Sequence, residues 1–345
     1  MAKTIIDVAH EANVSKSTVS LVLNNSPHIS ESKRKAVLDA MERIGYVPNT
    51  TARGLIKSRT YNLGVIECTV IPHISTYDFG HEANTFARDA TDGILAGLVD
   101  TNYGLLSAYW SPSEEKPWIL RRRCVDGVFL IGTAQMDSLI SAAGRLGLPV
   151  VVVGQQMEQE NNVFTDYGAG SVLGLRYLLG KGHKRILCLN SPAGYGTAEI
   201  RKKAVAEFCE HQGLLEGTVT LVSPQSNSGE GGRAAVKSVW DSNGPFDAVM
   251  ANDIMGLGAL RFFYERHISV PDDVSVLSFD DSFLCSYASP ALTAVNLNRE
   301  LSGRLAADMM LRMVSEKKSH GEKTVISVPI GIVPRESVKD RRTVR

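Results

Sequence analysis

The sequence predicts a small all-α head joined to an α/β body of two doubly wound parallel-sheet lobes. Three observations lead to this fold class. In the first 45 residues, apolar side chains recur at helical spacing, and a Ser or Thr precedes each helical segment. From residue 61 on, short segments rich in Val, Ile and Leu alternate with longer amphipathic ones, as in parallel sheets covered by helices on both faces. This alternation runs through two consecutive series, which predicts two lobes.

The first two helices of the head are predicted from their start signals. Thr4 can cap a helix, and Asp7 stands at its third position, where a carboxylate suits the positive end of the helix. Asn13 falls where the chain must turn, because Asn tolerates the left-handed conformation better than most residues. Ser15 can then cap a second helix. The apolar faces of the two helices are expected at Ile5, Val8, Ala9 and Ala12 and at Val19, Val22 and Leu23.

The face of the second helix opposite its apolar side is polar and carries Lys16, Ser17 and Ser20. A short helix with small polar residues and one Lys at its N-terminal end can enter a DNA major groove and meet bases and phosphates. Ser30 is expected to cap a third helix over 31–44, which Gly45 ends. The core stripe of that helix is predicted at Val37, Leu38, Met41 and Ile44. The three helices together predict a helix-turn-helix unit that binds DNA.

A short basic segment follows the head. Asn49 can cap a helix over 50–56, which has too few residues to be stable alone in water. Arg53, Lys57 and Arg59 give this segment charges suited to phosphates. Residues 1–60 carry nine Lys or Arg against five Asp or Glu, whereas the whole chain has no net charge. A basic head on an acidic body indicates nucleic-acid contact by the head alone.

The body is expected to alternate strands and helices. The first series has strands at 62–68, 103–109, 125–131 and 149–153, with helices at 90–100 and 136–146. The second series has strands at 186–189, 218–222, 248–251 and 274–279, with helices at 169–181, 198–212, 229–241 and 254–267. Ligands of such folds bind at the carboxyl ends of the strands, which here predicts a site in the cleft between the lobes.

Composition excludes several classes of protein. The 345 residues are 43% hydrophobic and 21% charged, as in ordinary globular proteins, and no apolar run reaches the length of a membrane span. Five widely separated cysteines (68, 124, 188, 209 and 285) form no CxxC pair, so we expect buried thiols rather than a disulfide or zinc framework. The chain begins with the helix-turn-helix itself, which leaves no room for a secretion signal and predicts a cytoplasmic, nucleoid-associated protein.

Catalytic motifs are also absent from the sequence. We find no nucleophile elbow, P-loop or HExxH pattern, and Gly229 to Gly232 lack the spacing of a dinucleotide site. We therefore expect no enzyme activity, no cofactor and no bound metal. Residues 70–88 are expected to form a long loop that contains His73, Asp78, His81 and Glu82. Their irregular spacing favours a solvated loop over a metal site.

Two stretches combine the features of the head in a fixed order: Val14-Ser15-x-x-Thr18-Val19-Ser20-x-Val22-Leu23-Asn24 and Gly45-Tyr46-x-Pro48-Asn49-x-x-Ala52-x-x-Leu55. They resemble the lactose-repressor/galactose-repressor family of bacterial transcription regulators. The body continues this resemblance through Gly180 to Ile186, Ala251-Asn252-Asp253, Phe279-Asp280-Asp281, Pro290 to Val295 and Val333 to Ser337, so it covers essentially the whole chain.

The resemblance implies how DNA is bound. In this family the hinge folds on the operator, and a Leu from each subunit wedges into the minor groove, which bends the duplex. Leu55 matches the wedge and Ala52 the close-contact position beside it. The implied DNA-binding residues are Thr4, Ser15, Lys16, Ser17, Ser20, Leu21, Asn24, Ser30, Arg34, Asn49, Ala52, Arg53, Leu55 and Lys57.

The resemblance also implies domain limits and an effector site. A DNA-binding domain is expected at 1–48, a hinge helix or linker at 49–60, and an effector-binding and dimerisation domain at 61–345 similar to periplasmic sugar-binding proteins. Its N-lobe is expected at about 61–160 plus 293–320 and its C-lobe at about 161–290 plus 321–340, with three crossings and an N-lobe helix near 298–317. The implied ligand residues are Phe164, Arg201, Asn252 and Asp280, whereas Asp253 and Asp281 are expected to cap helices.

The implied function is a homodimeric repressor of carbohydrate-related genes. It would bind double-stranded palindromic operator DNA under the control of a sugar-like small molecule. A dimer is preferred to a tetramer because residues 338–345 contain no leucine heptads. Two alternatives remain: a regulator controlled by a protein partner, and a ligand receptor with a vestigial DNA-binding head.

Three positions depart from the family pattern. Leu21 stands where the family usually has Arg, a natural partner of guanine, so the operator should differ from the usual one. Asn227 replaces an aromatic platform found in many sugar-binding members. Gly154 stands where the lactose repressor has an aspartate. The last two changes leave the identity of the effector open.

Overall fold

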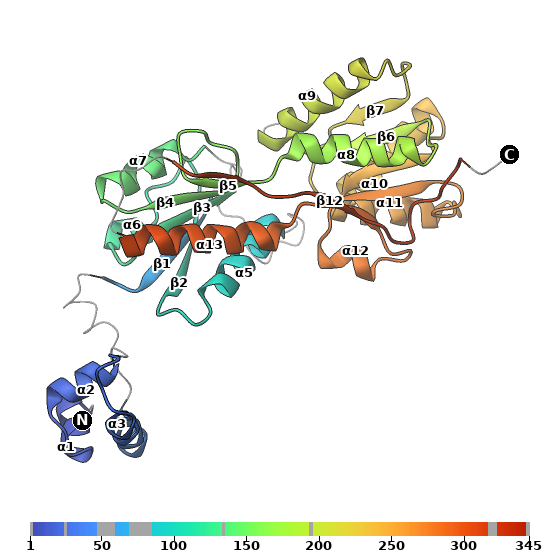
Figure 1. Cartoon of the computed structure of the whole chain (residues 1–345). Coiled ribbons are helices and arrows are strands. Elements are labelled where there is room, and N and C mark those ends of the chain that lie inside the picture. The colour runs from blue at the N-terminus through green and yellow to red at the C-terminus, as the bar shows by residue number, and fades with distance from the viewer. Residues whose placement is uncertain are drawn as a thin grey trace. The chain divides into compact units, whose positions relative to one another are not determined.

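The computed structural model describes residues 3–23, 26–46, 59–68, 85–132, 135–192, 196–316 and 323–342. The chain divides into two compact units, Met1–Tyr61 and Asn62–Arg345, which are called the head and the body below. The described residues of the head form helices α1 to α3, and those of the body form two sheets with flanking helices (Figure 1). The predicted fold class is confirmed.

The head is built from α1 (Ile5–Glu11), α2 (Lys16–Leu23) and α3 (Glu31–Ile44). The predicted start signal of α1 is confirmed, because Thr4 and Asp7 form a reciprocal capping box. Asn13 has a φ of 52° at the turn, and Gly45 ends α3 with a φ of 66°, as their residue types predict. The small core between the helices contains Val8, Ala9, Val19, Val22, Val37 and Ala40.

Two predictions for α3 are wrong in detail. Ser30 stands at the N-cap position, but its side chain makes no capping hydrogen bond, and its hydroxyl lies 3.2 Å from that of Ser32 instead. Leu38 is 50% exposed, and Ala40 is buried in its place. The reason is helical geometry: Ala40 lies three residues after the buried Val37 on the same face, whereas Leu38 is rotated by about 100° from Val37.

The first lobe contains a six-stranded parallel sheet in the order β11-β5-β4-β3-β1-β2. Its strands are β1 (Asn62–Cys68), β2 (Gly104–Trp110), β3 (Val128–Gly132), β4 (Val150–Gly154), β5 (Asn162–Phe164) and β11 (Val325–Ser327). Helices α5 (Thr85–Leu98) and α13 (Arg299–Glu316) pack on one face, and α6 (Trp118–Arg122) and α7 (Asp137–Arg145) on the other. Figure 1 shows α13 running along the sheet beside α5.

The second lobe has a six-stranded sheet in the order β12-β10-β9-β8-β6-β7. Its strands are β6 (Ile186–Leu189), β7 (Val219–Val222), β8 (Ala248–Asn252), β9 (Ser275–Asp280), β10 (Thr293–Asn296) and β12 (Gly331–Val333). The edge strand β12 runs antiparallel to β10, so the expectation of a purely parallel sheet is wrong at this edge. Helices α8 (Tyr167–Gly180) and α9 (Gly196–His211) cover one face, α10 (Gly229–Asn243) and α11 (Asp253–Glu265) cover the other, and the short α12 (Phe283–Tyr287) follows β9.

The chain passes between the lobes three times, after β5, after β10 and after β11. The helix predicted near 298–317 is present in the first lobe as α13. The predicted lobe limits differ from the sheets at these crossings, because β5 and β11 pair within the first sheet and β10 within the second. These strands have only three or four residues, and hydrogen bonds to distant partners decide to which sheet they belong.

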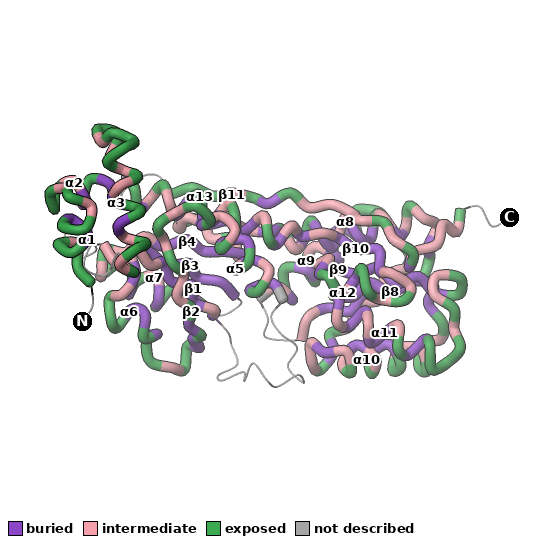
Figure 2. The backbone as a smooth tube through the Cα atoms, turned by 90° about the horizontal axis from the view of Figure 1, so that it is seen from below, coloured by how far each residue is buried: buried purple, intermediate pink, exposed green. Residues whose placement is uncertain are grey.

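Burial follows the layered arrangement. Figure 2 shows buried residues along the strands of both lobes and exposed residues on the outer sides of the helices. All five cysteines are free thiols, of which Cys68, Cys188 and Cys285 are buried and Cys124 and Cys209 are partly exposed. Within the described part of the chain, no helix has both the length and the apolar character needed to cross a membrane.

Candidate functional site

The candidate DNA-contacting surface of the head is the start of α2. Ser15 Oγ accepts a hydrogen bond from the Thr18 amide at 3.1 Å, which is the predicted cap, and it lies 2.7 Å from the Ser17 hydroxyl. Lys16, Ser17 and Leu21 are exposed, and the Leu21 side chain keeps 44% of its surface open to solvent. This arrangement leaves an ammonium group, a hydroxyl and an apolar side chain on the face that the sequence predicts for DNA.

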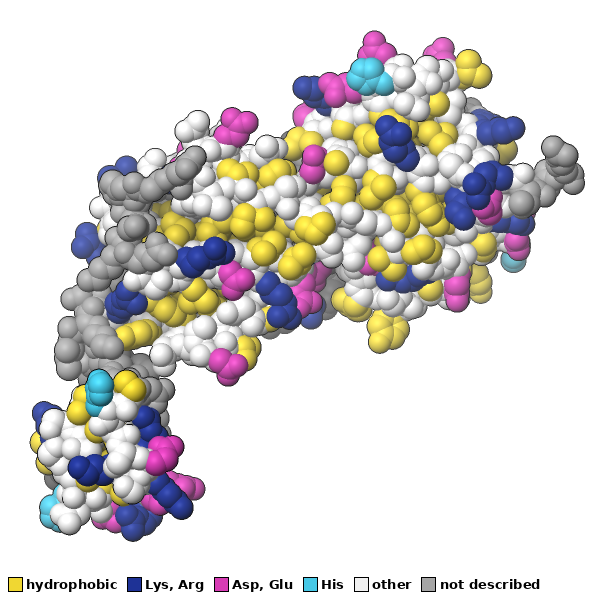
Figure 3. Space-filling view, in the orientation of Figure 1, with side chains coloured by type: hydrophobic (Ala, Val, Ile, Leu, Met, Phe, Trp, Pro, Cys, Tyr) yellow, Lys and Arg dark blue, Asp and Glu magenta, His cyan; other side chains and the backbone are white. Residues whose placement is uncertain are grey.

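Other predicted DNA-binding residues have structural partners inside the head. Thr4 Oγ1 lies 2.9 Å from the Asp7 carboxylate within the capping box. Arg34 donates to the Ser26 carbonyl at 2.9 Å and lies 3.5 Å from the Glu31 carboxylate. Ser20 lies on α2 and is half-buried, whereas six predicted residues lie outside the described residues: Asn24, Asn49, Ala52, Arg53, Leu55 and Lys57. Figure 3 shows both basic and acidic side chains on the drawn face of the head, in keeping with a modest positive surplus.

The predicted ligand residues of the body lie at or near strand ends. Phe164 ends β5 in the first lobe, while Asn252 ends β8 and Asp280 ends β9 in the second lobe. Arg201 lies on α9, which follows β6. The structure therefore brings Asp280 and Asn252 to one edge of the second sheet, at the carboxyl ends where ligands of such folds bind.

Arg201 is a buried cation with neutral partners. Arg201 is only 4% exposed to solvent. Its Nε donates a hydrogen bond to the Ser171 hydroxyl at 3.3 Å, and a terminal N–H donates to the Leu189 carbonyl at 3.4 Å. The guanidinium also stacks on the Phe279 ring, 4.2 Å from its centre. Among the residues that the structure describes, no carboxylate oxygen lies within 4.0 Å of Arg201. Burial lowers the pKa of Arg201, and the charge of Asp280 opposes this shift.

Asp280 is held by a residue that the sequence analysis did not single out. A terminal nitrogen of Arg299 lies 2.5 Å from the Asp280 carboxylate, and another lies 3.4 Å from the Asp89 carboxylate on α5. Burial raises the pKa of Asp280 to about 6, although the Arg299 charge opposes the shift. Arg299 opens α13, where a cation is disfavoured by the helix dipole, and this placement is the sequence signal that could have indicated a special role.

Aromatic rings flank these charges. The Tyr167 ring lies 6.5 Å from the rings of both Phe279 and Phe86. Gly154, which stands where the resemblance placed an aspartate, has a φ of 95°, and a Cβ there would lie 2.5 Å from the Phe86 ring. The Phe86 ring therefore fills the space that a side chain at position 154 would need. Phe164 is half-buried at the end of the neighbouring strand.

Both the oxygen and the nitrogen of the Asn252 side-chain amide make hydrogen bonds within the protein. Its Oδ1 accepts from the Met255 amide at 2.9 Å and caps α11, and its Nδ2 donates to Asn227 Oδ1 at 2.6 Å. A ligand contact by Asn252 would use the second N–H of the amide.

The expectation that Asp253 and Asp281 cap the helices after them is wrong. Asp253 follows the Asn252 cap and instead accepts hydrogen bonds from the Ser278 hydroxyl and from the amides of Asp281 and Ser282. Asp281 pairs with Arg335 at 2.7 Å. Both carboxylates therefore fix the turn that follows β9, and this turn carries Asp280.

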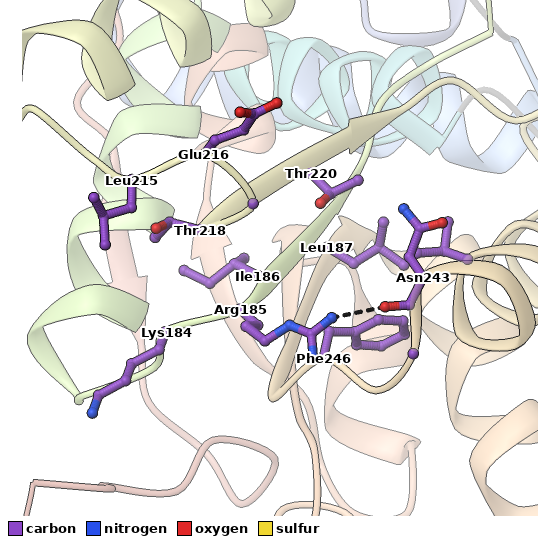
Figure 4. Close-up of a pocket in the computed structure, with 13 residues that line it drawn as sticks. Lys184, Arg185, Ile186, Leu187, Leu215, Glu216, Thr218, Thr220, Asn243 and Phe246 are labelled. Atoms are coloured by element: carbon purple, nitrogen blue, oxygen red, sulfur yellow. Dashed lines mark hydrogen bonds between the residues drawn. The ribbon is translucent and has the colours of Figure 1, made fainter.

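A cavity of about 490 Å³ lies elsewhere in the second lobe. Figure 4 shows its lining at the amino ends of β6 and β7, where Arg185 donates to the Asn243 carbonyl. None of the predicted ligand residues lines it, because they lie near the opposite, carboxyl ends of the strands. Within the described ranges no set of His, Cys, Asp or Glu side chains is arranged for a metal, and His73, Asp78, His81 and Glu82 lie outside them.

Comparisons with known proteins match both parts of the chain. A family model described as bacterial regulatory proteins, lacI family, matches residues 4–49, and one described as a periplasmic binding protein-like domain matches residues 175–338. The transcriptional regulator CelR of Thermobifida fusca is 30% identical over 331 residues, which cover 94% of this chain and 95% of that protein.

Two solved structures are similar over nearly the whole chain. A CelR–cellobiose complex has a TM-score of 0.66 at 27% identity and covers 97% of this chain and 99% of its own. A lac repressor dimer bound to operator and the anti-inducer ONPF has a TM-score of 0.76 at 21% identity, with coverage of 98% and 100%. The second likeness concerns the fold alone.

Proposed function

The chain belongs to the lacI family of bacterial regulatory proteins, and from this premise we propose that it is a DNA-binding transcriptional repressor controlled by a small molecule. Its targets are carbohydrate-related genes, and its effector is a sugar or a sugar derivative. The observation that carries the proposal is the presence in one chain of a capped α2 with an exposed polar face and of a body in which Asp280 at the end of β9 lies near the buried Arg201 of α9. The proposal assigns no catalytic role and locates the protein with the nucleoid in the cytoplasm.

Each head of a homodimer contacts one half-site of a palindromic operator. Lys16 lies near phosphates, and Ser17, Ser20 and Leu21 face base edges, where Leu21 packs against a thymine methyl group rather than pairing with guanine. The hinge residues contribute the minor-groove contacts, with Leu55 as the wedge that bends the centre of the site. Domain limits of 1–48, 49–60 and 61–345 fit this division of roles.

The effector acts from the body. Arg201 donates to ligand oxygens, Asp280 accepts from ligand donors, and Phe164 and Asn252 contribute at neighbouring strand ends. A bound effector changes how the first lobes of the two subunits pack and hence how the two hinges meet. Coupling of this kind is typically worth about 1–3 kcal/mol.

Selection of binding sites from random duplex DNA tests the DNA-binding part. The full-length protein, at a fixed salt concentration, should enrich a palindrome with a pyrimidine–purine step at its centre. Leu55→Ala should weaken binding to the selected site by about tenfold, whereas the control Leu38→Ala, in an exposed leucine on α3, should not. Failure to enrich any site, with or without added sugars, would refute the proposal.

Arg201→Ala tests the effector part. The variant should bind the selected operator like the wild type and should lose the response to a sugar that changes wild-type operator binding. A variant that still responds like the wild type would show that Arg201 is not an effector ligand.

A further inference from the structure

We propose that Arg299 determines the chemical class of the effector: by holding the Asp280 carboxylate, it leaves Arg201 to bind an effector that carries an anionic group. This inference deepens the proposed function and rests on it. The effector class is a sugar that bears a carboxylate or a phosphate.

The first step concerns the pairing of Asp280. Arg299 is 6% exposed and reaches two carboxylates, Asp280 at 2.5 Å in the second lobe and Asp89 at 3.4 Å in the first. A planar guanidinium can satisfy two carboxylates at once because its five N–H groups point in several directions. Asp280 therefore already has a charged partner before any effector arrives.

The second step concerns Arg201. Buried charges are costly unless an opposite charge is near, and the partners of Arg201 are a hydroxyl, a carbonyl and an aromatic ring. Asp280 acts on Arg201 electrostatically, but its carboxylate is bonded to Arg299. An anionic group on the effector would supply the direct ion pair that Arg201 does not have within the described residues.

The third step concerns competing acids around the site. Asp253 is buried, but a hydroxyl and two backbone amides satisfy its carboxylate. The end of β4 offers no acid, because Gly154 stands there and the Phe86 ring occupies the space beside it. The Arg299 guanidinium itself lies 5.8 Å from the centre of that ring. The surroundings of Arg201 thus combine aromatic rings with carboxylates that are already engaged.

These contacts favour an anionic sugar. A guanidinium binds carboxylates and phosphates through charge-assisted hydrogen bonds, which are stronger than those to neutral hydroxyls. The rings of Tyr167, Phe279 and Phe86 lie near the same charges, and Phe279 and Phe86 are buried in the hydrophobic cores of the two lobes. A neutral hexose would leave Arg201 without a direct ion pair among the described residues, with Asp280 acting on it only at longer range.

Calorimetric titration of the full-length protein tests the inference with matched probes. D-glucuronate is compared with D-glucose, D-galacturonate with D-galactose, and glucose 6-phosphate with D-glucose. At least one anionic probe should bind about tenfold or more tightly than its neutral counterpart, since hydrogen bonds between charged groups exceed neutral ones by about that factor. The uronate and phosphate arms distinguish the two sources of the anion.

Arg299→Met tests the residue. Without Arg299, Asp280 is available to pair with Arg201, so the preference for the anionic probe should fall about tenfold. Arg299→Gln removes the same charge with a polar side chain and provides a second variant if the methionine form does not fold. The matched control is Arg304→Met on the same helix, because Arg304 is half-exposed and pairs only with Glu300 at 2.7 Å among the described residues. The control should keep the wild-type preference.

Three results would overturn the inference. The first is equal affinity of the wild type for anionic and neutral probes. The second is an unchanged preference in both Arg299 variants. The third is no binding of any anionic probe by a protein that still binds its selected operator. Loss of operator selection itself would instead refute the proposed function, so the two failures are distinguishable.

Discussion

The contact between α5 and α13 makes a sharp prediction about Gly303. A Cβ added at Gly303 would lie 1.9 Å from the Ala90 carbonyl oxygen, and one at Gly93 would lie 2.0 Å from the Glu300 carbonyl oxygen. A carbon and a carbonyl oxygen normally stay about 3.3 Å apart, so Gly303→Ala must move the two helix backbones apart by roughly 1.4 Å. The obstacle is backbone on both sides, and no side-chain rotation can relieve it.

The magnitude follows from opposing contributions. Overpacking a close contact costs about 1–3 kcal/mol, and a backbone obstacle puts this site at the upper end. Separating the helices also loosens the buried side chains between them, including Ile94 and Met310. The greater helix propensity of Ala over Gly returns about 1 kcal/mol. We therefore expect Gly303→Ala to lower the free energy of unfolding of the body by about 2 kcal/mol.

Urea unfolding followed by tryptophan fluorescence measures this effect in the body alone, because all three tryptophans (110, 118 and 240) lie there. The matched control is Gly144→Ala in α7, where an added Cβ would meet nothing within 4 Å. This control should stabilise the body by about 0.5–1 kcal/mol. If Gly303→Ala unfolds at the same urea concentration as the control or the wild type, the close approach of α5 and α13 is wrong.

Three further predictions concern the head and the charged site. In the head, Val37→Ala should lower the free energy of unfolding by about 2 kcal/mol, whereas Leu38→Ala should change it by less than about 0.5 kcal/mol. Thermal unfolding of the head measures both, and equal losses would contradict the observed core. The pKa of Asp280 is raised to about 6 from an unfolded value of about 3.9, so the folded protein favours the protonated carboxyl. The resulting contribution to the free energy of unfolding is complete below about pH 4 and is lost as the pH rises through 6. The wild type should therefore lose stability relative to Asp280→Asn between about pH 4 and 7, and parallel pH profiles of the two proteins would refute this. Leu21→Arg should enrich guanine at one position of each selected half-site, and an unchanged selected sequence would show that Leu21 does not face a base.

The sequence predicted best what depends on neighbouring residues. The Thr4 and Asp7 capping box, the left-handed Asn13 and the glycine stop at Gly45 follow from local backbone chemistry, and the structure contains all three. The membership of β5, β10 and β11 in one sheet or the other depends on hydrogen bonds to distant strands, and the predicted lobe limits missed it. Arg299 was missed for the same reason, since its partner Asp89 is 210 residues away in the sequence.

Asp280 shows how one residue can be predicted correctly in place and incompletely in role. The strand-end position was evident from the alternation of strands and helices, and β9 does end there. The chemistry of Asp280 depends on Arg299, which lies where the chain passes from β10 to α13. It also depends on the turn after β9, where the Ser282 amide donates a hydrogen bond to the Asp253 carboxylate. The strand-end motif therefore identified the position of Asp280, whereas only the fold identified Arg299 as the cation that pairs with it.

The bridge through Arg299 also explains how occupancy of the site could be coupled to the arrangement of the lobes. An effector shifts an equilibrium only by as much as its affinity differs between two states. The two carboxylates of the bridge come from different lobes, so any change in lobe orientation alters one ion-pair distance relative to the other. The contact to Asp89, at 3.4 Å, is the looser of the two and would respond first. Because Asp89 belongs to α5 and Arg299 to α13, that response would reach the same pair of helices whose backbones touch at Gly303.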